Sequence, residues 1–198
     1  MVVGITGGIG SGKSTVVERL KIMGKIAVYN ADFEAKKLMN GSKVIREKLI
    51  ALFGEESFTS TGLNRNFIAD IVFNNKKKLR QLNSIVHPEV FNHLNSFITK
   101  NQSQDYILYE NAILFENKSD EFCDYIITVI ADTDKRIQRV IERDGITKQE
   151  VEKRINNQWK ADKKVLLSNY IITNNCLKTI DSQIVEIHNN LTKKNLSI

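Results

Sequence analysis

The chain has 198 residues, enough to bury a sizeable core within one domain that carries small appended lobes. Hydrophobic residues make up 41% and charged residues 26%, as in ordinary soluble globular proteins, and no apolar run approaches the length of a membrane span. The net charge of +6 fits either a lysine-rich surface or attraction of polyanions such as nucleotides, coenzymes or nucleic acid, and charge alone does not separate these interpretations.

The first predicted elements are a short β-strand at 2–6, a glycine-rich loop and a helix that ends at Gly24. The loop, Gly7 to Ser14, has the sequence GGIGSGKS and fits G-x-x-x-x-G-K-[S/T] between a strand and a helix, the context that supports this motif. Glycines let successive backbone N–H groups turn inward around an anion, and the helix adds its positive end. We therefore expect this loop to bind ATP or GTP.

Two side chains of the loop have separate expected roles. Lys13 reaches the β- and γ-phosphates as a movable point charge, and the hydroxyl of Ser14 ligates Mg²⁺. Switches, motors and small-molecule kinases all use such a loop, so it leaves the reaction open.

A second buried strand is predicted at 26–30, and Asp32 follows it directly. An acid at the carboxyl end of a strand that neighbours the phosphate loop faces the ligand crevice of an open parallel sheet. Its carboxylate could orient an acceptor hydroxyl, accept its proton or hold Mg²⁺ through water. The alternative is that Asp32 caps the helix that follows, and the local sequence does not separate the two.

Helical patterns dominate from Asp32 to about Lys100, like an insertion beside the sheet. Within it, Arg80 and His87 are candidate contacts for an anionic substrate. The alternatives are a surface arginine and a structural histidine at a helix boundary, because the residue before a proline is disfavoured in a helix. Breaks in the helical pattern are expected at Asn40-Gly41, Gly54, Thr61-Gly62 and His87-Pro88.

Three near-continuous apolar runs follow, at 105–110, 124–131 and 169–173, as expected of strands covered on both faces. Glu110 ends the first run, where it either holds a Mg²⁺-bound water or is a solvated strand end. Strands that alternate with helices predict an α/β fold with a central parallel sheet between two helical layers.

Between the last two runs, charged helical segments flank Asp144-Gly145 and look like a hinged flap. Thr147 and Glu150 form a capping box for the second segment. A final helix is expected at roughly 178–192.

Six segments spread over roughly residues 2 to 190 are informative together. They are GITGGIGSGKST (4–15), YNADFEAKKL (29–38), LRQLNSIVHPEV (79–90), ILFE (113–116), RVIERDGITKQEVEKRINNQ (139–158) and YIITNN (170–175). In this order they resemble the dephospho-CoA kinase family. The phosphate loop is generic, but LNSIVHP and RDGITKQEVEKRI together are specific to this family.

The resemblance implies a P-loop kinase that uses ATP to phosphorylate the ribose 3′-hydroxyl of dephospho-CoA, giving coenzyme A and ADP in the last step of coenzyme A synthesis. It implies ATP and Mg²⁺ as cofactors and three parts of the chain. These are a nucleotide-binding core (1–31, 101–138 and 160–198), a helical substrate domain (32–100) and a helical lid (139–159).

The resemblance also implies site residues. Asp32 matches the proposed base for the acceptor hydroxyl, and Arg143, with Arg139 as a weaker partner, falls in the lid, where guanidinium groups can bind the transferring phosphoryl oxygens. The ATP contacts are expected from Gly8, Gly10, Ser11, Gly12, Lys13, Ser14 and Thr15.

The chain departs from the family pattern by one extra residue between Gly24 and Asp32 and by three substitutions. Asn30 replaces the first acid of a D-A-D segment, Ala112 stands where a proline is expected, and Cys176 replaces a glycine near the presumed adenine end. None of these changes removes an atom that the reaction clearly needs.

Two other functions remain open. Another P-loop kinase, such as a nucleoside monophosphate kinase, fits the size and the lid pattern. A nucleotide-switched module or a nucleic-acid-binding ATPase fits the charge, but NNCL and NNKK are poor substitutes for the N-K-x-D guanine motif of a switch GTPase, and no basic stripe interleaved with aromatics appears. We therefore expect a small-molecule substrate, no nucleic-acid or membrane partner, and an oligomeric state that the sequence leaves open, with a monomer favoured.

The cellular location is predicted from the N-terminus and the cysteines. No basic segment followed by an apolar run and a small-residue cleavage site begins the chain. Cys123 and Cys176 form no metal-type cluster and are expected as reduced core or loop residues. The expected location is the cytoplasm.

Overall fold

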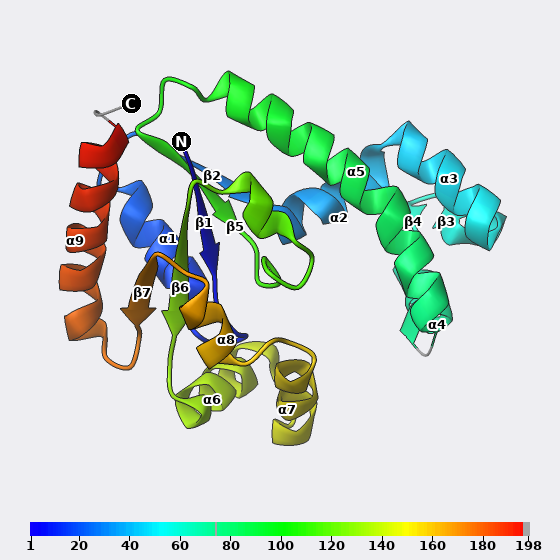
Figure 1. The fold of residues 1–198 in the computed structure, drawn as a ribbon. Coiled ribbons are helices and arrows are strands. Elements are labelled where there is room, and N and C mark those ends of the chain that lie inside the picture. Colours follow the sequence, from blue (N-terminus) through cyan, green and yellow to red (C-terminus); the bar gives the residue numbers. More distant parts are fainter. Residues whose placement is uncertain (74, 196–198) are drawn as a thin grey trace. The chain divides into compact units, whose positions relative to one another are not determined.

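The computed structural model describes residues 1–73 and 75–195, which divide into two compact units. The core unit combines Met1–Tyr29 with the chain from Asn101 onward, and the helical unit is Asn30–Lys100. Figure 1 follows both along the chain by colour. Each unit has a buried hydrophobic cluster of its own.

The core unit is built on a five-stranded sheet in the order β2-β5-β1-β6-β7. β1 pairs in parallel with β5 and with β6, and β6 pairs in parallel with β7. All of β1 is buried, as expected of a central strand covered on both faces. The predicted α/β fold with a central parallel sheet is confirmed. The strands are β1 (Val2–Thr6), β2 (Ile26–Asn30), β5 (Tyr106–Glu110), β6 (Tyr125–Ile130) and β7 (Tyr170–Thr173).

The prediction of a buried strand at 26–30 is wrong in one respect. β2 forms, but it lies at the edge of the sheet, and only Tyr29 is fully buried. A continuous apolar run does not distinguish an edge strand from a central one, because the two differ in the number of neighbouring strands and not in local pattern.

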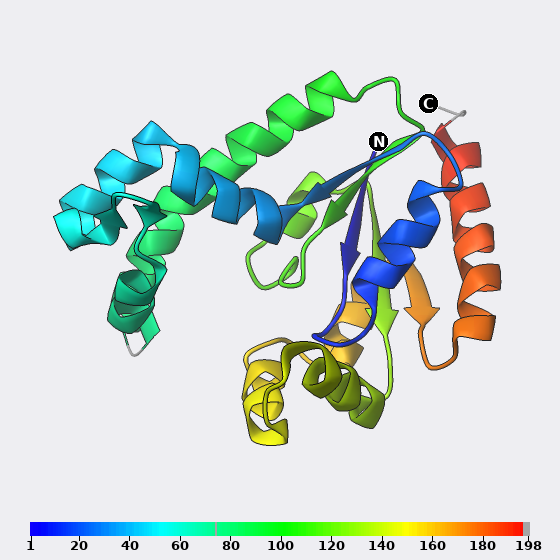
Figure 2. The same ribbon diagram turned by 180° about the vertical axis from the view of Figure 1, so that it is seen from behind.

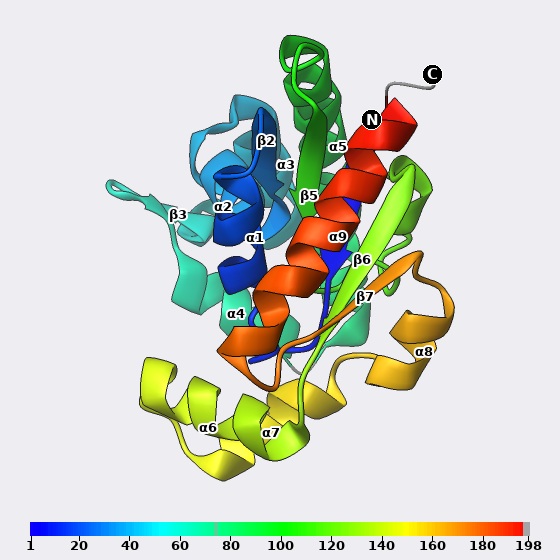
Figure 3. The same cartoon turned by 90° about the vertical axis from the view of Figure 1, so that its left-hand side faces the viewer.

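Helices cover both faces of this sheet. α1 (Lys13–Lys21) and α9 (Leu177–Asn195) lie side by side on one face, as Figures 2 and 3 show, and they bury residues such as Leu20 and Ile184 against the strands. α8 (Ala161–Leu166) packs on the other face against β6. A short 3₁₀ turn, η2 (Ser119–Phe122), precedes β6.

Two further helices of the core unit follow β6 at the carboxyl ends of the strands. α6 (Thr133–Asp144) ends at Gly145, which is left-handed, and α7 (Lys148–Asn156) begins after Thr147. The predicted capping box is confirmed, since Thr147 accepts from the N–H of Glu150 and the Glu150 carboxylate accepts from the N–H of Thr147.

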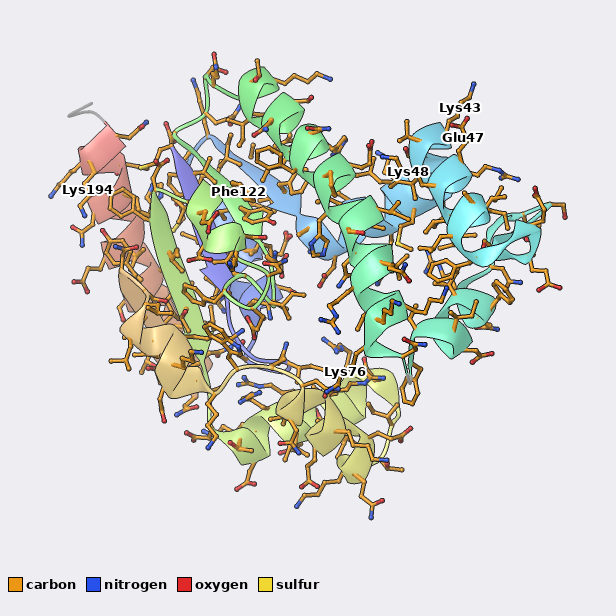
Figure 4. All side chains as sticks on the ribbon, turned by 45° about the vertical axis from the view of Figure 1, so that its right-hand side comes forward. Lys43, Glu47, Lys48, Lys76, Phe122 and Lys194 are labelled. Atoms are coloured by element: carbon orange, nitrogen blue, oxygen red, sulfur yellow. The ribbon has the colours of Figure 1, made fainter. Side chains whose placement is uncertain are left out.

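The helical unit buries a cluster that includes Ile45, Leu49 and Leu82. On α3, the charged Lys43, Glu47 and Lys48 project outward, whereas Ile45 and Leu49 face the cluster (Figure 4). The elements are α2 (Ala31–Gly41), α3 (Lys43–Phe53), η1 (Glu55–Ser57), the antiparallel pair β3 (Phe58–Thr59) and β4 (Gly62–Leu63), α4 (Arg65–Phe73) and α5 (Lys76–Lys100).

Three of the predicted breaks fall where elements end or turn, but the break at His87-Pro88 is wrong. α5 runs without interruption through Pro88. The buried Leu82, Val86 and Leu94 lie on one side of the helix at spacings of four and eight residues, and packing of this side offsets the backbone hydrogen bond that Pro88 cannot donate. The small hairpin β3–β4 was not predicted, because two-residue strands carry no periodic signal.

Although α5 has 25 residues, neither it nor any other helix in the described part of the chain is long and apolar enough to cross a membrane.

We predict that Pro88→Ala stabilises the protein. Alanine restores a backbone donor in the middle of α5 and relieves the clash of the proline ring with the preceding turn, so the free energy of unfolding should rise by about 2 kcal/mol. Urea denaturation followed by circular dichroism measures the change. A fall in this free energy would show that packing of the helical unit depends on the local geometry that Pro88 imposes.

Candidate phosphate-binding site

The segment between β1 and α1 has the backbone geometry of an anion-binding loop. Gly10 and Gly12 have φ angles of +76° and +90°, a region that side chains rarely allow. A Cβ at Gly10 would collide with the carbonyl oxygen of Arg136, and a Cβ at Gly12 would collide with the side-chain amide of Asn174. Both positions therefore require glycine for conformation and for space.

Side chains from elsewhere in the core unit hold the loop by its carbonyl oxygens. Arg136 Nε donates to the carbonyl of Ile9 at 2.9 Å, and Asn174 Nδ2 donates to that of Ser11 at 2.9 Å. In a trans peptide the C=O and the following N–H point in opposite directions. These two bonds therefore fix the N–H groups of Gly10 and Gly12 on the opposite side of the loop.

The start of α1 supplies the remaining anion donors. Gly12 is the N-cap residue and offers no side-chain cap, so the first turn keeps N–H groups for an anion. The Lys13 ammonium donates to the carbonyl of Gly7 at 2.9 Å, which folds the side chain back along the loop. Ser14 and Thr15 are exposed in the same turn. The structure thus brings the predicted loop residues together.

Arg139 also lies against the loop. Its guanidinium donates to the carbonyls of Gly10 at 3.4 Å and Asn174 at 3.0 Å. Asn174 is 2% exposed, and its Oδ1 and the Oγ of Ser11 are buried without a hydrogen-bond partner among the described residues. The sequence predicts Arg139 as a nucleotide contact, and the structure places it where it supports the loop from outside.

Arg143 is placed differently from Arg139. Its side chain is 63% exposed and makes two hydrogen bonds to Asp144, at 2.7 and 3.1 Å. Arg154 of α7 donates to the same carboxylate at 3.0 Å. The hydrogen bond from Arg143 holds the pKa of Asp144 below its ordinary value, so this carboxylate stays charged. Arg143 must leave Asp144 to bind a phosphate.

Asp32 is an exposed residue in the first turn of α2, in the helical unit. It does not cap that helix, because the N-cap is Asn30, whose side chain accepts from the N–H of Phe33 at 2.9 Å. The structure thereby removes the capping alternative and gives Asn30, a departure from the family pattern, a structural role. The Asp32 carboxylate remains available for a substrate.

Arg80 and His87 both lie on α5, seven residues apart and therefore on the same side of the helix. Arg80 is exposed, and its Nε donates to the carbonyl of Lys76 at 3.3 Å. His87 is exposed, and desolvation by the surrounding protein lowers the pKa of its imidazole, which favours the neutral form at pH 7. A neutral imidazole can hydrogen-bond to a substrate without adding charge.

The predicted metal ligands are oxygen donors of the kind that Mg²⁺ uses. Ser14 lies in the first turn of α1, and Glu110 ends β5 directly opposite Ile5 of β1. The described residues contain no group of three or more acids, histidines or cysteines that would hold a metal without help. The donors fit Mg²⁺ bound by one hydroxyl, phosphates and water, which is its usual mode in phosphoryl-transfer sites.

A buried ion pair lies beside the loop, and no sequence pattern predicted it. Lys164 is 1% exposed and lies 2.9 Å from Glu116 and 2.8 Å from the carbonyl of Ala112. Burial lowers the pKa of Lys164, and the hydrogen bond to Glu116 opposes that shift. Because the contact at Ala112 uses the backbone oxygen, an alanine in place of the family's proline leaves it intact.

The helical unit contains two adjoining hollows of about 200 and 500 Å³ that share Lys36 and Arg65. Lys36 lies one helical turn beyond Asp32 on α2. In the described part of the chain, neither Lys36 nor Arg65 forms an ion pair. The other lining residues are Phe33, Lys37, Met39, Asn40, Gly41, Leu63, Ile68 and Ala69.

Known proteins are similar to this chain in sequence and in fold. A family model described as dephospho-CoA kinase matches residues 1–179. A relative from Fusobacterium nucleatum, named dephospho-CoA kinase, is 38% identical over 88% of this chain and 90% of its own.

Two solved structures are also similar. TT1252 from Thermus thermophilus has a TM-score of 0.85 at 27% identity, over 94% of this chain and 95% of its own. A dephospho-CoA kinase from Campylobacter jejuni has a TM-score of 0.71 over 98% of both chains, and at 21% identity this likeness concerns the fold alone. On the family match and the identity to the Fusobacterium relative, the chain belongs to the dephospho-CoA kinase family.

Proposed function

We propose that this protein transfers the γ-phosphoryl group of ATP to the ribose 3′-hydroxyl of dephospho-CoA, giving coenzyme A and ADP. The observation that carries the proposal is a phosphate loop already formed, with its carbonyls held from outside, in a chain of this family. The N–H groups of the loop and of the first turn of α1 bind the β- and γ-phosphates. Lys13 leaves the carbonyl of Gly7 to neutralise the charge that develops there.

Ser14 and Glu110 would hold Mg²⁺, which supplies charge neutralisation at the phosphates when it is bound. Arg143 enters from the lid, defined as residues 139–159, and exchanges the Asp144 carboxylate for a phosphoryl oxygen. Arg139 contributes by fixing Gly10 and Asn174 rather than by reaching the γ-phosphate. Closure of the lid excludes water, which would otherwise hydrolyse ATP.

Asp32 orients the acceptor hydroxyl and accepts its proton during transfer. Three features support this role: the carboxylate is exposed, it is not used as a helix cap, and it lies two residues after the end of β2. A carboxylate in this position raises the nucleophilicity of the hydroxyl by taking its proton as the bond to phosphorus forms.

The paired hollows of the helical unit bind the rest of the acceptor. From the ribose hydroxyl at Asp32, the acceptor's diphosphate lies a few bonds away, and Lys36 lies about 6 Å further along α2 by helical rise. Lys36, Lys37 and Arg65 match a diphosphate in charge, and the apolar Met39 and Ile68 match the chain beyond it. Arg80 and His87 on α5 add contacts to the acceptor.

The test of the function is direct. The protein is incubated with Mg-ATP and dephospho-CoA, and the acceptor is analysed by mass. We expect one added phosphate, located at the 3′ position by nuclease or phosphatase mapping. A parallel panel of nucleoside monophosphates and small alcohols tests other small-molecule kinases. Turnover of one of these, with none of dephospho-CoA, would overturn the assignment.

We predict that Asp32→Asn lowers kcat by about 10²–10⁴-fold, because the amide keeps the shape but accepts no proton. The affinity for ATP should stay within a factor of about two, since that site is built by the loop. Steady-state kinetics and calorimetric titration of ATP measure the two quantities. Asp70→Asn, an exposed acid on α4, is the matched control. Near-normal kcat in Asp32→Asn would assign the proton transfer elsewhere.

We predict that Arg65→Ala raises KM for dephospho-CoA by about tenfold to a hundredfold, as expected for the loss of a charge-assisted contact. With adenosine as the acceptor, which has no diphosphate, the variant and the wild type should have similar KM. Lys48→Ala, an outward cation on α3, is the control. An equal loss with both acceptors would place Arg65 away from the diphosphate.

A further inference from the structure

One residue of the phosphate loop, Ile9, is held on three sides by the segment that follows β6. Its N–H donates to Gln158 Oε1 at 2.8 Å, and its carbonyl accepts from Arg136 Nε at 2.9 Å. Both backbone polar groups of Ile9 are therefore paired with side chains. The acceptor on Gln158 must be the amide oxygen, since a backbone N–H can only donate.

The side chain of Ile9 packs into the apolar cluster of the α6–α7 pair. Ile137 and Val140 of α6 and Val151 of α7 are buried at the centre of that cluster. Among its described members, Ile9 alone comes from outside this stretch of the chain. The remaining members are Ile141, Ile146 and Ile155.

The two hydrogen bonds fasten the helix pair near both of its ends. Arg136 is in the first turns of α6, and Gln158 lies two residues beyond α7. Between these ends, Arg154 bonds to Asp144 and ties the helices to each other. Figures 1 and 2 show α6 and α7 side by side at the end of the core unit where the phosphate loop lies. Movement of the pair as a unit must therefore act on Ile9.

The two hydrogen bonds to Ile9 differ in strength. A guanidinium donor makes a charge-assisted bond, and Arg136 is 9% exposed. Gln158 makes a bond between neutral groups, which is weaker. A neutral acceptor also suits a site beside phosphates, because a carboxylate there would repel them. We therefore expect the hydrogen bond between Ile9 and Gln158 to break before the one between Ile9 and Arg136.

We propose that Ile9 couples occupancy of the phosphate loop to the position of α6–α7, with Gln158 and Arg136 as positioning residues. Phosphates that bind the N–H groups of Gly10 and Gly12 restrict the two peptide groups that flank Ile9. The Ile9 N–H and carbonyl then hold Gln158 and Arg136, and through them both ends of the helix pair. The inference rests on the proposed function in one respect, that α6–α7 carries the lid.

Hydrogen exchange of α7 amides, with and without a non-hydrolysable ATP analogue, tests the coupling. In the wild type, the analogue should slow α7 exchange by about tenfold, and α6 exchange by less. Gln158→Met has a similar length but no acceptor, and it should lose this nucleotide effect. Gln158→Glu keeps the acceptor and should retain this effect once the analogue is saturating, because its negative charge weakens phosphate binding. Gln149→Met, an exposed substitution on α7 itself, is the matched control.

Enzyme kinetics distinguish a positioning role of Gln158 from a purely structural one. Gln158→Met should lower kcat for dephospho-CoA about tenfold and change the affinity for ATP by less than threefold. It should also raise the ratio of the rate of ATP hydrolysis, measured without acceptor, to the rate of phosphoryl transfer. Gln149→Met, the exposed control on α7, should behave as the wild type in all three measurements.

The outcomes separate the two proposals. Full nucleotide protection of α7 in Gln158→Met would overturn the coupling through Ile9 while leaving the lid in place. Absence of protection in the wild type would overturn both the coupling and the lid. Neither result affects the identity of the phosphorylated product, which is measured separately.

Discussion

The structure depends on one constraint: the phosphate loop must point its N–H groups inward, so its carbonyl groups must be satisfied on the outer side. A loop that left those oxygens unpaired and buried would be destabilised by about 1–3 kcal/mol for each oxygen. Arg136 and Asn174 meet this requirement at Ile9 and Ser11. The glycines at 10 and 12 make room for these same two neighbours.

The constraint explains why distant segments converge on residues 7–15. α6 follows β6 and supplies Arg136, the end of β7 leads into Asn174, and the segment after α7 supplies Gln158. Parallel strands bring their carboxyl ends to one edge, so these side chains reach the loop although they come from residues more than a hundred positions away. The loop is therefore preformed, and binding need not order it.

Much of this was predictable from sequence, and the exceptions have physical causes. The strands appeared as apolar runs, and the glycine loop and the Thr147–Glu150 cap were recognisable because their chemistry is local. Pro88 was misjudged, since packing of Leu82, Val86 and Leu94 overrides a local preference.

The supports of the site carried no local signal. Arg136, Gln158 and Lys164 act through contacts with residues far along the chain. The roles of Asp32, Arg143 and Glu110 were taken from motif position, and they remain proposals. The structure contributes the local surroundings of each, including the cap by Asn30 that leaves the Asp32 carboxylate available.

The central claim is that the loop is held open from outside before nucleotide arrives. Amide exchange and chemical shifts of the ¹⁵N-labelled protein, titrated with ADP, test it most directly. The account predicts that the Ile9 amide is already protected without nucleotide, because it is bonded to Gln158, and that ADP adds to this protection. The Gly10, Gly12 and Lys13 amides should shift strongly as phosphate binds. Rapid exchange at Ile9 until ADP is added would contradict the account.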